Sequence, residues 1–253
     1  MRGIAIIEYL AESEQPQTLS EIATMLSIPK SSALDLLHTL IQSEIIIYDN
    51  PSFKTYKLGI KLFTLGATSK TKNKLGNICK PYLLNLREKT GKTIYLAVPH
   101  DIYLIYIDKL ESRSPIQSTA HIGSTNPLYL TGLGKAILAT YSNEKVQHML
   151  KETVFEKRTP YTINNIRNLI EDLTQTRARG YAIDNREGVE YIHCFAAPIL
   201  DFGNQTVAAI SIMSIINEIG DKETKEYPLL LTETALAISQ NLGYKRKELY
   251  VEH

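Results

Sequence analysis

Three polar side chains in the C-terminal half of the sequence stand where apolar strands are expected. Asp184 follows a short apolar segment, and Cys194 and Ser211 lie within the apolar runs 192–200 and 206–213. A buried polar atom needs a hydrogen-bond partner, either in the protein or in a ligand. The pattern therefore indicates either a small-molecule site or hydrogen bonds within the protein. The structural alternatives are a turn cap for Asp184, a small buried hydrophobe for Cys194 and a bond from Ser211 to its own strand.

A glycine-rich segment, 131–140 (TGLGKAILAT), predicts a turn that leads into a short apolar helix. Gly132 and Gly134 flank this turn, where unpaired backbone N–H groups and the helix dipole can receive a carboxylate or another anion. The spacing lacks the longer glycine-rich run of a P-loop, so a nucleoside triphosphate is not expected. The alternative is a helix start that needs glycine only for close packing.

The neighbours His193 and Cys194 invite a comparison with cysteine-dependent enzymes. Adjacent residues of a strand point to opposite faces, so His193 cannot easily act as the base for Cys194. The same geometry argues against a metal site, and the six histidines form no pair at ligand spacing. We expect no enzyme, no catalytic or metal-binding residue and no cofactor, and keep an enzyme that uses Cys194 as an alternative.

Polar residues near the N-terminus are suited to contact DNA. A helix expected from about residue 30 carries a polar stripe whose side chains can reach base edges or phosphates, and Lys30 near its start favours a phosphate. Two further lysines lie on a following hairpin, where they can contact the flanking backbone. The candidate DNA-contacting residues are Lys30, Ser31, Ser32, Asp35, His38, Lys54 and Lys57.

The charge balance limits this DNA hypothesis. Residues 1–65 contain five Lys or Arg and seven Asp or Glu, within a chain of net charge +1. Affinity would have to come from a few placed cations, so a single copy would bind weakly and two copies would be needed. Asp35 would repel phosphates but could accept a hydrogen bond from a cytosine amino group; otherwise it faces water or a nearby cation. A three-helix module that binds another protein is the alternative.

Hydrophobic periodicity predicts the elements that position these residues. Three short helices and a hairpin are expected before residue 59, and the second helix starts near Leu19 because Thr18 and Glu21 form a capping box. A turn of about four residues precedes the third helix, which is expected to begin at about Pro29 or Lys30. This arrangement is typical of a winged helix-turn-helix.

The rest of the chain interleaves expected helices and strands. The helices are expected at about 60–65, 78–89, 131–140, 143–150, 162–179 and 222–242, and the strands at 93–98, 102–110, 192–200 and 206–213. Gly91 and Gly180 are placed to end two of the helices. This order predicts an α+β domain with an antiparallel or mixed sheet.

Composition sets the class of protein. The chain has 253 residues, 43% of them hydrophobic and 22% charged, which is enough apolar surface for a folded core. No apolar run is long enough to span a bilayer and glutamates come early, so we expect a cytoplasmic protein without a membrane partner. Cys79 and Cys194 are too few for a disulfide framework or a four-ligand zinc site.

Several short motifs, in this order, resemble the IclR family of bacterial and archaeal transcriptional regulators. They are Leu19-Ser20-Glu21-Ile22-Ala23, Ile28-Pro29-Lys30-Ser31-Ser32, Tyr56-Lys57-Leu58-Gly59, Gly132-Leu133-Gly134-Lys135-Ala136-Ile137-Leu138-Ala139, Thr159 with Thr162-Ile163, Arg179-Gly180-Tyr181-Ala182, Cys194 with Ala196-Ala197-Pro198-Ile199, and Ala208-Ala209-Ile210-Ser211-Ile212. The resemblance implies a winged helix-turn-helix DNA-binding domain at 1–60, a linker helix at 61–76 and a GAF-like (profilin-like) effector domain at 77–253, with a central antiparallel sheet flanked by helices.

The resemblance also implies partners and a ligand site. It implies a repressor that senses a small organic acid and binds, as a homodimer or homotetramer, to a palindromic operator in double-stranded DNA. The residues at effector-lining positions are Gly132, Leu133, Asp184, Ile192, Cys194 and Ser211, with Met213 where some members have a second serine. Tyr191 stands where glycine is usual. We expect its side chain to fill part of the pocket, which argues against a ligand as small as glyoxylate or pyruvate and leaves room for an aromatic or longer acid.

Overall fold

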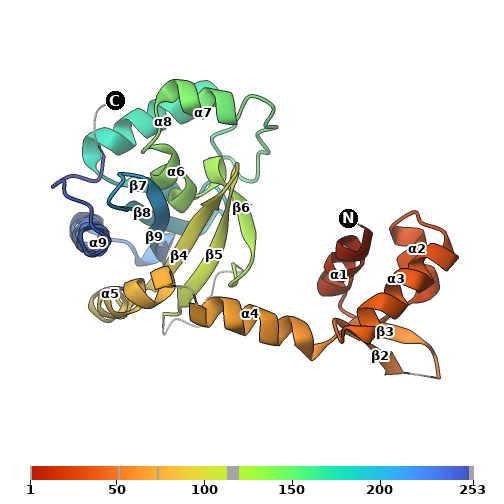
Figure 1. The fold of residues 1–253 in the computed structure, drawn as a ribbon. Helices are drawn as coiled ribbons and strands as arrows, with labels where there is room; N and C mark the ends of the chain where they lie inside the picture. Colours follow the sequence, from red (N-terminus) through yellow and green to blue (C-terminus); the bar gives the residue numbers. More distant parts are fainter. Residues whose placement is uncertain (1, 51, 73, 113–119, 251–253) are drawn as a thin grey trace. The chain divides into compact units, whose positions relative to one another are not determined.

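The chain divides into two compact units, residues 1–74 and 75–253, each with its own core (Figure 1). The structure, a computed structural model, describes residues 2–50, 52–72, 74–112 and 120–250. Within the described part of the chain, no helix combines the length and the apolar character that a bilayer crossing requires.

The N-terminal unit packs helices on a small antiparallel sheet of order β1-β3-β2. Its elements are α1 (Arg2–Glu12), β1 (Gln17–Thr18), α2 (Leu19–Met25), α3 (Lys30–Gln42), β2 (Ile46–Asn50), β3 (Thr55–Leu58) and α4 (Ile60–Lys72). The predicted capping box is present: the Glu21 carboxylate accepts the Thr18 N–H at 2.7 Å, and Thr18 Oγ1 accepts the Glu21 N–H at 3.3 Å. The two-residue strand β1 was not predicted, since so short a segment carries no periodicity.

Apolar side chains from all three of the first helices meet over this sheet. The buried cluster consists of Ile6, Leu10, Ile22, Leu37, Ile46 and Tyr56. Residues 26–29 separate α2 from α3, the turn length that the sequence predicts. Burying Ala33 and Leu37 fixes the rotation of α3 about its axis, so the opposite, polar side of the helix faces outward.

The C-terminal unit is built on a six-stranded sheet of order β6-β5-β4-β9-β8-β7, in which every neighbouring pair is antiparallel. Its elements are α5 (Lys74–Thr90), β4 (Thr93–His100), β5 (Tyr103–Leu110), β6 (Thr125–Pro127), η1 (Leu128–Leu130), α6 (Gly132–Leu138), α7 (Asn143–Met149), α8 (Ile166–Arg179), β7 (Ala182–Asn185), β8 (Ile192–Leu200), β9 (Thr206–Ile215), η2 (Ile216–Glu218) and α9 (Asp221–Asn241). The expected α+β class with an antiparallel sheet is confirmed.

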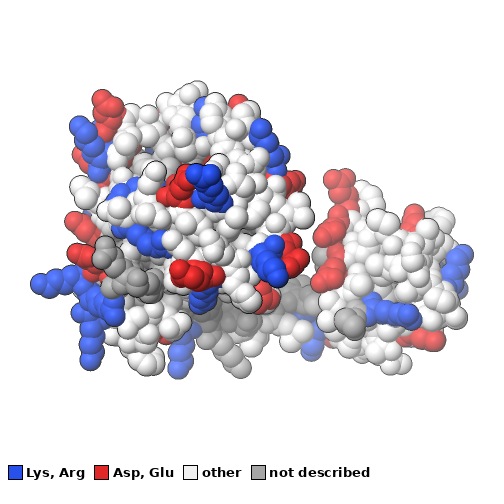
Figure 2. Space-filling view, turned by 90° about the horizontal axis from the view of Figure 1, so that it is seen from above, with Lys and Arg blue, Asp and Glu red and all other residues white. Residues whose placement is uncertain are grey.

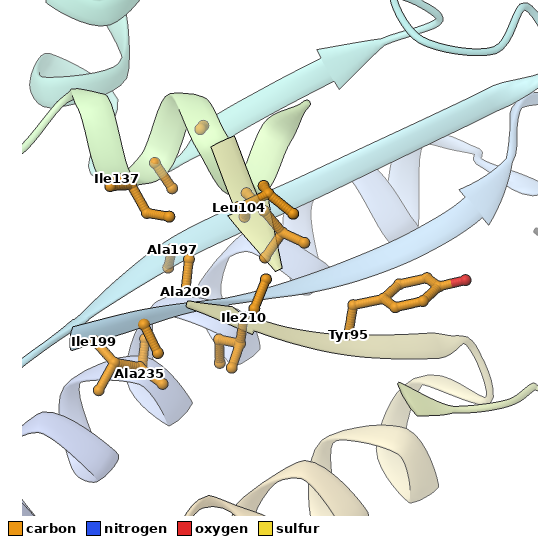
Figure 3. Packing of buried hydrophobic residues seen from close by; sticks show 14 of the residues in the cluster. Tyr95, Leu104, Ile137, Ala197, Ile199, Ala209, Ile210 and Ala235 are labelled. Carbon is orange, nitrogen blue, oxygen red and sulfur yellow. The ribbon is translucent and has the colours of Figure 1, made fainter. Parts of the chain in front are cut away.

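Helices cover both faces of this sheet. On one face α9 packs against β8, where the Leu200 N–H donates to Ser239 Oγ at 3.0 Å, and Figure 3 shows Ala235 of α9 beside Ile199. The opposite face receives α6: a Cβ placed on Gly132 would lie 3.5 Å from the Ala196 Cβ. In Figure 3 the Tyr95 ring points away from the aliphatic side chains. The candidate site lies on this α6 side.

Helix α8 differs from the sequence prediction at its first turn. It begins at Ile166, with Asn165 Oδ1 accepting the Asn168 N–H at 2.9 Å, whereas a start near Thr162 was expected. The expected start is wrong because the Thr162 hydroxyl accepts the N–H groups of Arg158 and Thr159 and donates to Glu187 O at 2.7 Å. These bonds hold residue 162 in a loop. The helix ends at Gly180 (φ 87°), as predicted.

Candidate functional site

A cavity of about 260 Å³ lies on the α6 side of the C-terminal sheet. Alternate residues of a strand share a face, so β8 and β9 direct Cys194, Ser211 and Met213 to the same side. All seven residues that the sequence nominated for an effector line this one cavity: Gly132, Leu133, Asp184, Ile192, Cys194, Ser211 and Met213. The Ser211 hydroxyl makes no hydrogen bond to another residue in the described part of the chain, so it is available to a ligand.

Asp184 combines two of the roles considered for it. Its Oδ1 accepts the Glu187 N–H at 2.8 Å, so it caps a turn, and the same side chain lines the cavity while only 6% exposed. Burial raises the pKa of Asp184 to about 6, although Lys135 and the N–H groups of Glu187 and Gly188 act in the opposite direction. Near neutral pH this carboxyl can therefore accept a hydrogen bond or carry a proton.

A buried ion cluster lies next to Asp184. Lys135, which is 0% exposed, places its Nζ 2.5 Å from Glu187 Oε1 and 3.1 Å from Asp172 Oδ2. Burial and the nearby Asp184 raise the pKa of Glu187 to about 7, and the charge of Lys135 opposes that rise. Lys135 is thus the buried cation that allows three acidic residues to share this part of the core.

The glycine-rich start of α6 is shaped by close packing. A Cβ on Gly134 would lie 2.0 Å from Leu128 O, so only glycine fits there. The Gly134 N–H already donates to Thr131 Oγ1 at 3.0 Å, which removes one of the donors that the sequence offered to an anion. The close-packing alternative therefore accounts for Gly134.

Other residues that line the cavity were missed in the sequence. They are Tyr95, Tyr106, Ala120, Ser124, Thr125, Asn126, Thr131, Arg158, Gly188 and Val189. Strand alternation could have nominated the two tyrosines, since both occupy predicted strands. The loop residues carry no periodic signal.

The expectation for Tyr191 is wrong. Its side chain is 46% exposed and is not among the described residues that line the cavity. The next residue, Ile192, lines the cavity, and successive side chains alternate between faces as β8 begins. Tyr191 therefore leaves the cavity open.

Cys194 and His193 do not form a nucleophile and base. Burial, followed by the charges of Asp184 and Glu187, raises the pKa of the Cys194 thiol well above its ordinary value, so the thiol is protonated. Burial lowers the pKa of His193 to about 4, and its ring packs edge-on against Phe195. Among the described residues, no group of three His, Cys, Asp or Glu side chains is arranged to hold a metal ion.

The candidate DNA-contacting residues lie on the outer side of the N-terminal unit. On α3, Lys30, Ser31, Asp35 and His38 are exposed and Ser32 is half-buried; on the hairpin, Lys54 and Lys57 are exposed. Lys57 Nζ lies 2.7 Å from Asp49 Oδ1, which partly neutralises its charge. On the face drawn in Figure 2, basic and acidic side chains of the described residues are interspersed, without a broad area of one sign.

Comparison with known proteins gives matches along most of the chain. The family described as "Bacterial transcriptional regulator IclR C-terminal" matches residues 68–240, and the "IclR helix-turn-helix domain" matches residues 1–49. The HTH-type transcriptional repressor AllR of Escherichia coli K12 is 30% identical over 244 residues, which cover 96% of this chain and 90% of AllR. The transcriptional repressor IclR of the same strain is 32% identical over 247 residues, with 97% and 90% covered.

Solved structures share the fold. The Thermotoga maritima IclR structure has a TM-score of 0.79 at 30% identity and covers 96% of this chain and 97% of its own. An IclR homologue from Microbacterium hydrocarbonoxydans, solved in complex with 4-hydroxybenzoate, has a TM-score of 0.80. At 19% identity, over 95% of this chain and 97% of its own, that structure supports the fold alone.

Proposed function

Since the chain belongs to the IclR family of DNA-binding transcriptional regulators, we propose that it is a repressor whose hold on DNA is controlled by a small organic acid in the cavity of the C-terminal unit. The names of AllR and IclR, both repressors, support the direction of control. The coupling is reciprocal: an acid that weakens DNA binding must itself bind the DNA complex less tightly.

The observation that carries the effector assignment is the convergence of all seven nominated residues on one cavity. The walls include the rings of Tyr95 and Tyr106, which favour an aromatic or longer acid over a two- or three-carbon one. The 4-hydroxybenzoate bound by the M. hydrocarbonoxydans homologue is therefore a reasonable first compound to test.

We assign DNA contacts to the exposed stripe of α3 and to the hairpin. Lys30, Lys54 and Lys57 would contact phosphates, and Ser31, Ser32, Asp35 and His38 would lie toward the major groove. The few cations of the N-terminal unit support binding by two copies to a palindromic operator.

Helix α4 supports the assignment of a homodimer or homotetramer. It exposes the apolar side chains of Ile60, Phe63 and Leu65, and exposed apolar surface on a helix is suited to pairing with a second copy. Pairing would place two copies of α3 on two half-sites of one operator.

The DNA assignment is tested by salt titration of binding to the promoter upstream of the chain's own gene. Lys30→Ala and Lys54→Ala should each weaken binding and lower the salt slope by about one, because each removes one phosphate contact. Lys151→Ala, which removes an exposed lysine of the C-terminal unit, is the matched control and should leave the slope unchanged. Unchanged slopes in both test variants would refute the phosphate assignment, and no binding at low salt would favour a protein-interaction module.

The effector assignment is tested by a thermal-shift screen of organic acids, followed by DNA release. A ligand that binds only the folded state raises the melting temperature with its concentration. An acid that stabilises the protein should also release the promoter fragment at similar concentrations. An acid that shifts melting without changing DNA affinity would refute the control mechanism.

A further inference from the structure

Arg158 is the one cationic side chain among the described residues that line the cavity. The start of α6, which the sequence offered as an anion site, has its Gly134 N–H occupied by Thr131. Among the described lining residues, Arg158 is therefore the only positively charged side chain that a carboxylate can meet, beside the N–H groups of Gly132 and Leu133 at the start of α6. Arginine suits this task because its planar guanidinium can donate two parallel hydrogen bonds to one carboxylate.

The backbone at Arg158 is held in place by hydrogen bonds. The N–H groups of Arg158 and Thr159 both donate to Thr162 Oγ1, at 3.1 and 2.9 Å. In turn, Thr159 Oγ1 donates to Arg186 O and Thr162 Oγ1 donates to Glu187 O, each at 2.7 Å. The loop that carries Arg158 is thus fastened to the turn that follows β7.

The same turn holds Asp184. Its carboxylate accepts the Glu187 N–H at 2.8 Å, so one hydrogen-bonded unit fixes both Arg158 and Asp184 around the cavity. A basic group and an acidic group held on one frame set a fixed polarity for any ligand between them.

The guanidinium itself is directed by a short chain of polar side chains. Arg158 Nη1 donates to Asn126 Oδ1 at 3.3 Å, and Asn126 Nδ2 donates to Tyr106 OH at 3.3 Å. Both Asn126 and Tyr106 line the cavity. Arg158 Nε also lies 3.5 Å from Glu156 Oε2, an exposed carboxylate, and its remaining N–H groups are free of partners in the described chain. Asn126 is thus a positioning residue for Arg158.

Exposure distinguishes the two charged side chains that line the cavity. The Arg158 side chain is 38% exposed, whereas Asp184 is almost completely buried. Ser211 and Met213 are buried as well, whereas Thr125 is exposed. The cation therefore lies toward solvent and the acid toward the interior, where a second anion would be repelled and a neutral hydrogen-bond donor would be accepted.

This inference rests on the proposed function: we propose that Arg158 binds the carboxylate of the effector and that Asp184 accepts a hydrogen bond from a hydroxyl or N–H group at the other end of the same molecule. The effector class is then a carboxylic acid that carries a neutral donor remote from its carboxylate. Arg158 selects for charge, and Asp184 selects for the donor.

The test uses matched acids on the full-length chain by titration calorimetry. The probes are 4-hydroxybutanoate and 4-hydroxybenzoate, in which the hydroxyl is remote from the carboxylate. Butanoate and benzoate are the analogues without the hydroxyl, and the amide of each hydroxy acid is the analogue without the charge. Arg158→Gln should lower the affinity for the tightest-binding hydroxy acid about ten- to a hundredfold, because a charge-assisted hydrogen bond is lost. Arg158→Lys should retain part of the affinity.

Further comparisons separate the roles of the two residues. Arg158→Gln should remove the preference of the protein for an acid over its amide. Asn126→Ala should lower the affinity for the acid less than Arg158→Gln does. Arg167→Gln, which removes an exposed arginine of α8, is the control and should leave affinity unchanged. The parent hydroxy acid should bind the unaltered protein more tightly than its analogue without the hydroxyl, a test of Asp184 that needs no variant.

The outcomes distinguish this inference from the proposed function. Equal affinity of Arg158→Gln and the unaltered chain would overturn the carboxylate anchor while acid sensing stands. Equal affinity for an acid and its analogue without the hydroxyl would overturn the role of Asp184. Should none of the acids bind the unaltered protein while it still binds its promoter, the effector assignment fails first and the inference falls with it.

Discussion

Replacing Lys135 with Met gives a direct test of the buried ion cluster. Lys135 is 0% exposed and lies 2.5 Å from Glu187 Oε1 and 3.1 Å from Asp172 Oδ2, with Asp184 nearby. Methionine keeps most of the side-chain volume but leaves these carboxyl groups without their buried cation. Breaking a buried ion pair in this way costs about 3–5 kcal/mol in the free energy of unfolding.

The loss of stability in Lys135→Met should depend on pH. In the unaltered chain the folded-state pKa values of Asp184 and Glu187 are raised to about 6 and about 7. A carboxyl group whose pKa is higher in the folded than in the unfolded state stabilises the fold fully at a pH below its unfolded pKa. This contribution is lost as the pH rises through its folded-state pKa. Without Lys135 both folded values rise further. Lys135→Met should therefore cost most at about pH 8 and much less at about pH 5, where protons replace the missing charge.

The measurement is urea denaturation followed by far-ultraviolet circular dichroism, since the chain contains no tryptophan. Protein concentration is kept constant because association would shift the apparent stability. Lys151→Met is the control, since Lys151 is exposed and its ion pair with Glu152 spans 3.9 Å; it should change stability by less than about 0.5 kcal/mol. An equal loss at both pH values in Lys135→Met would mean that packing, not charge, is responsible.

Two further predictions concern the start of α6 and a thiol that lines the cavity. Gly134→Ala should destabilise the protein by about 3 kcal/mol in the same assay, despite the better helix propensity of alanine, because the new Cβ would lie 2.0 Å from Leu128 O. Gly3→Ala is the control and should change stability little, because open space surrounds Gly3. A Gly134→Ala variant as stable as the unaltered protein would contradict the close-packing account. At about pH 8, Cys194 should react with iodoacetamide at least about tenfold more slowly than a free thiol, because its raised pKa keeps the thiol protonated. An acid bound in the cavity should slow the reaction further. Rapid labelling of Cys194, detected by peptide mass mapping, would contradict the protonated, buried state of this thiol.

Local patterns predicted the elements that depend on neighbouring residues. The capping box at Thr18 and Glu21, the turn before α3 and the stop at Gly180 all lie within a few positions of the residues they affect. The first turn of α8 could not be predicted in this way, because Thr162 is held by the carbonyl of Glu187, which lies on a different segment.

The candidate site shows the same division. Family resemblance nominated seven residues that line the cavity, but it also led to a wrong expectation for Tyr191, whose direction depends on the register of β8. Arg158 was missed because it stands in a loop without periodicity, although it directly precedes Thr159, which the resemblance had singled out. Lys135 appeared only as part of a glycine motif, since its acidic partners come from distant segments.

The central pairing of the C-terminal sheet has a consequence for synthesis on the ribosome. Thr93 of β4 pairs with Met213 of β9, so two halves of the sheet meet across a long stretch of chain. Until β9 emerges, one edge of β4 has no partner, and the cavity lacks Ser211 and Met213. The internal contacts of residues 1–74 need nothing that is translated later. A nascent chain can therefore complete its helix-turn-helix unit well before the cavity of the C-terminal unit is closed.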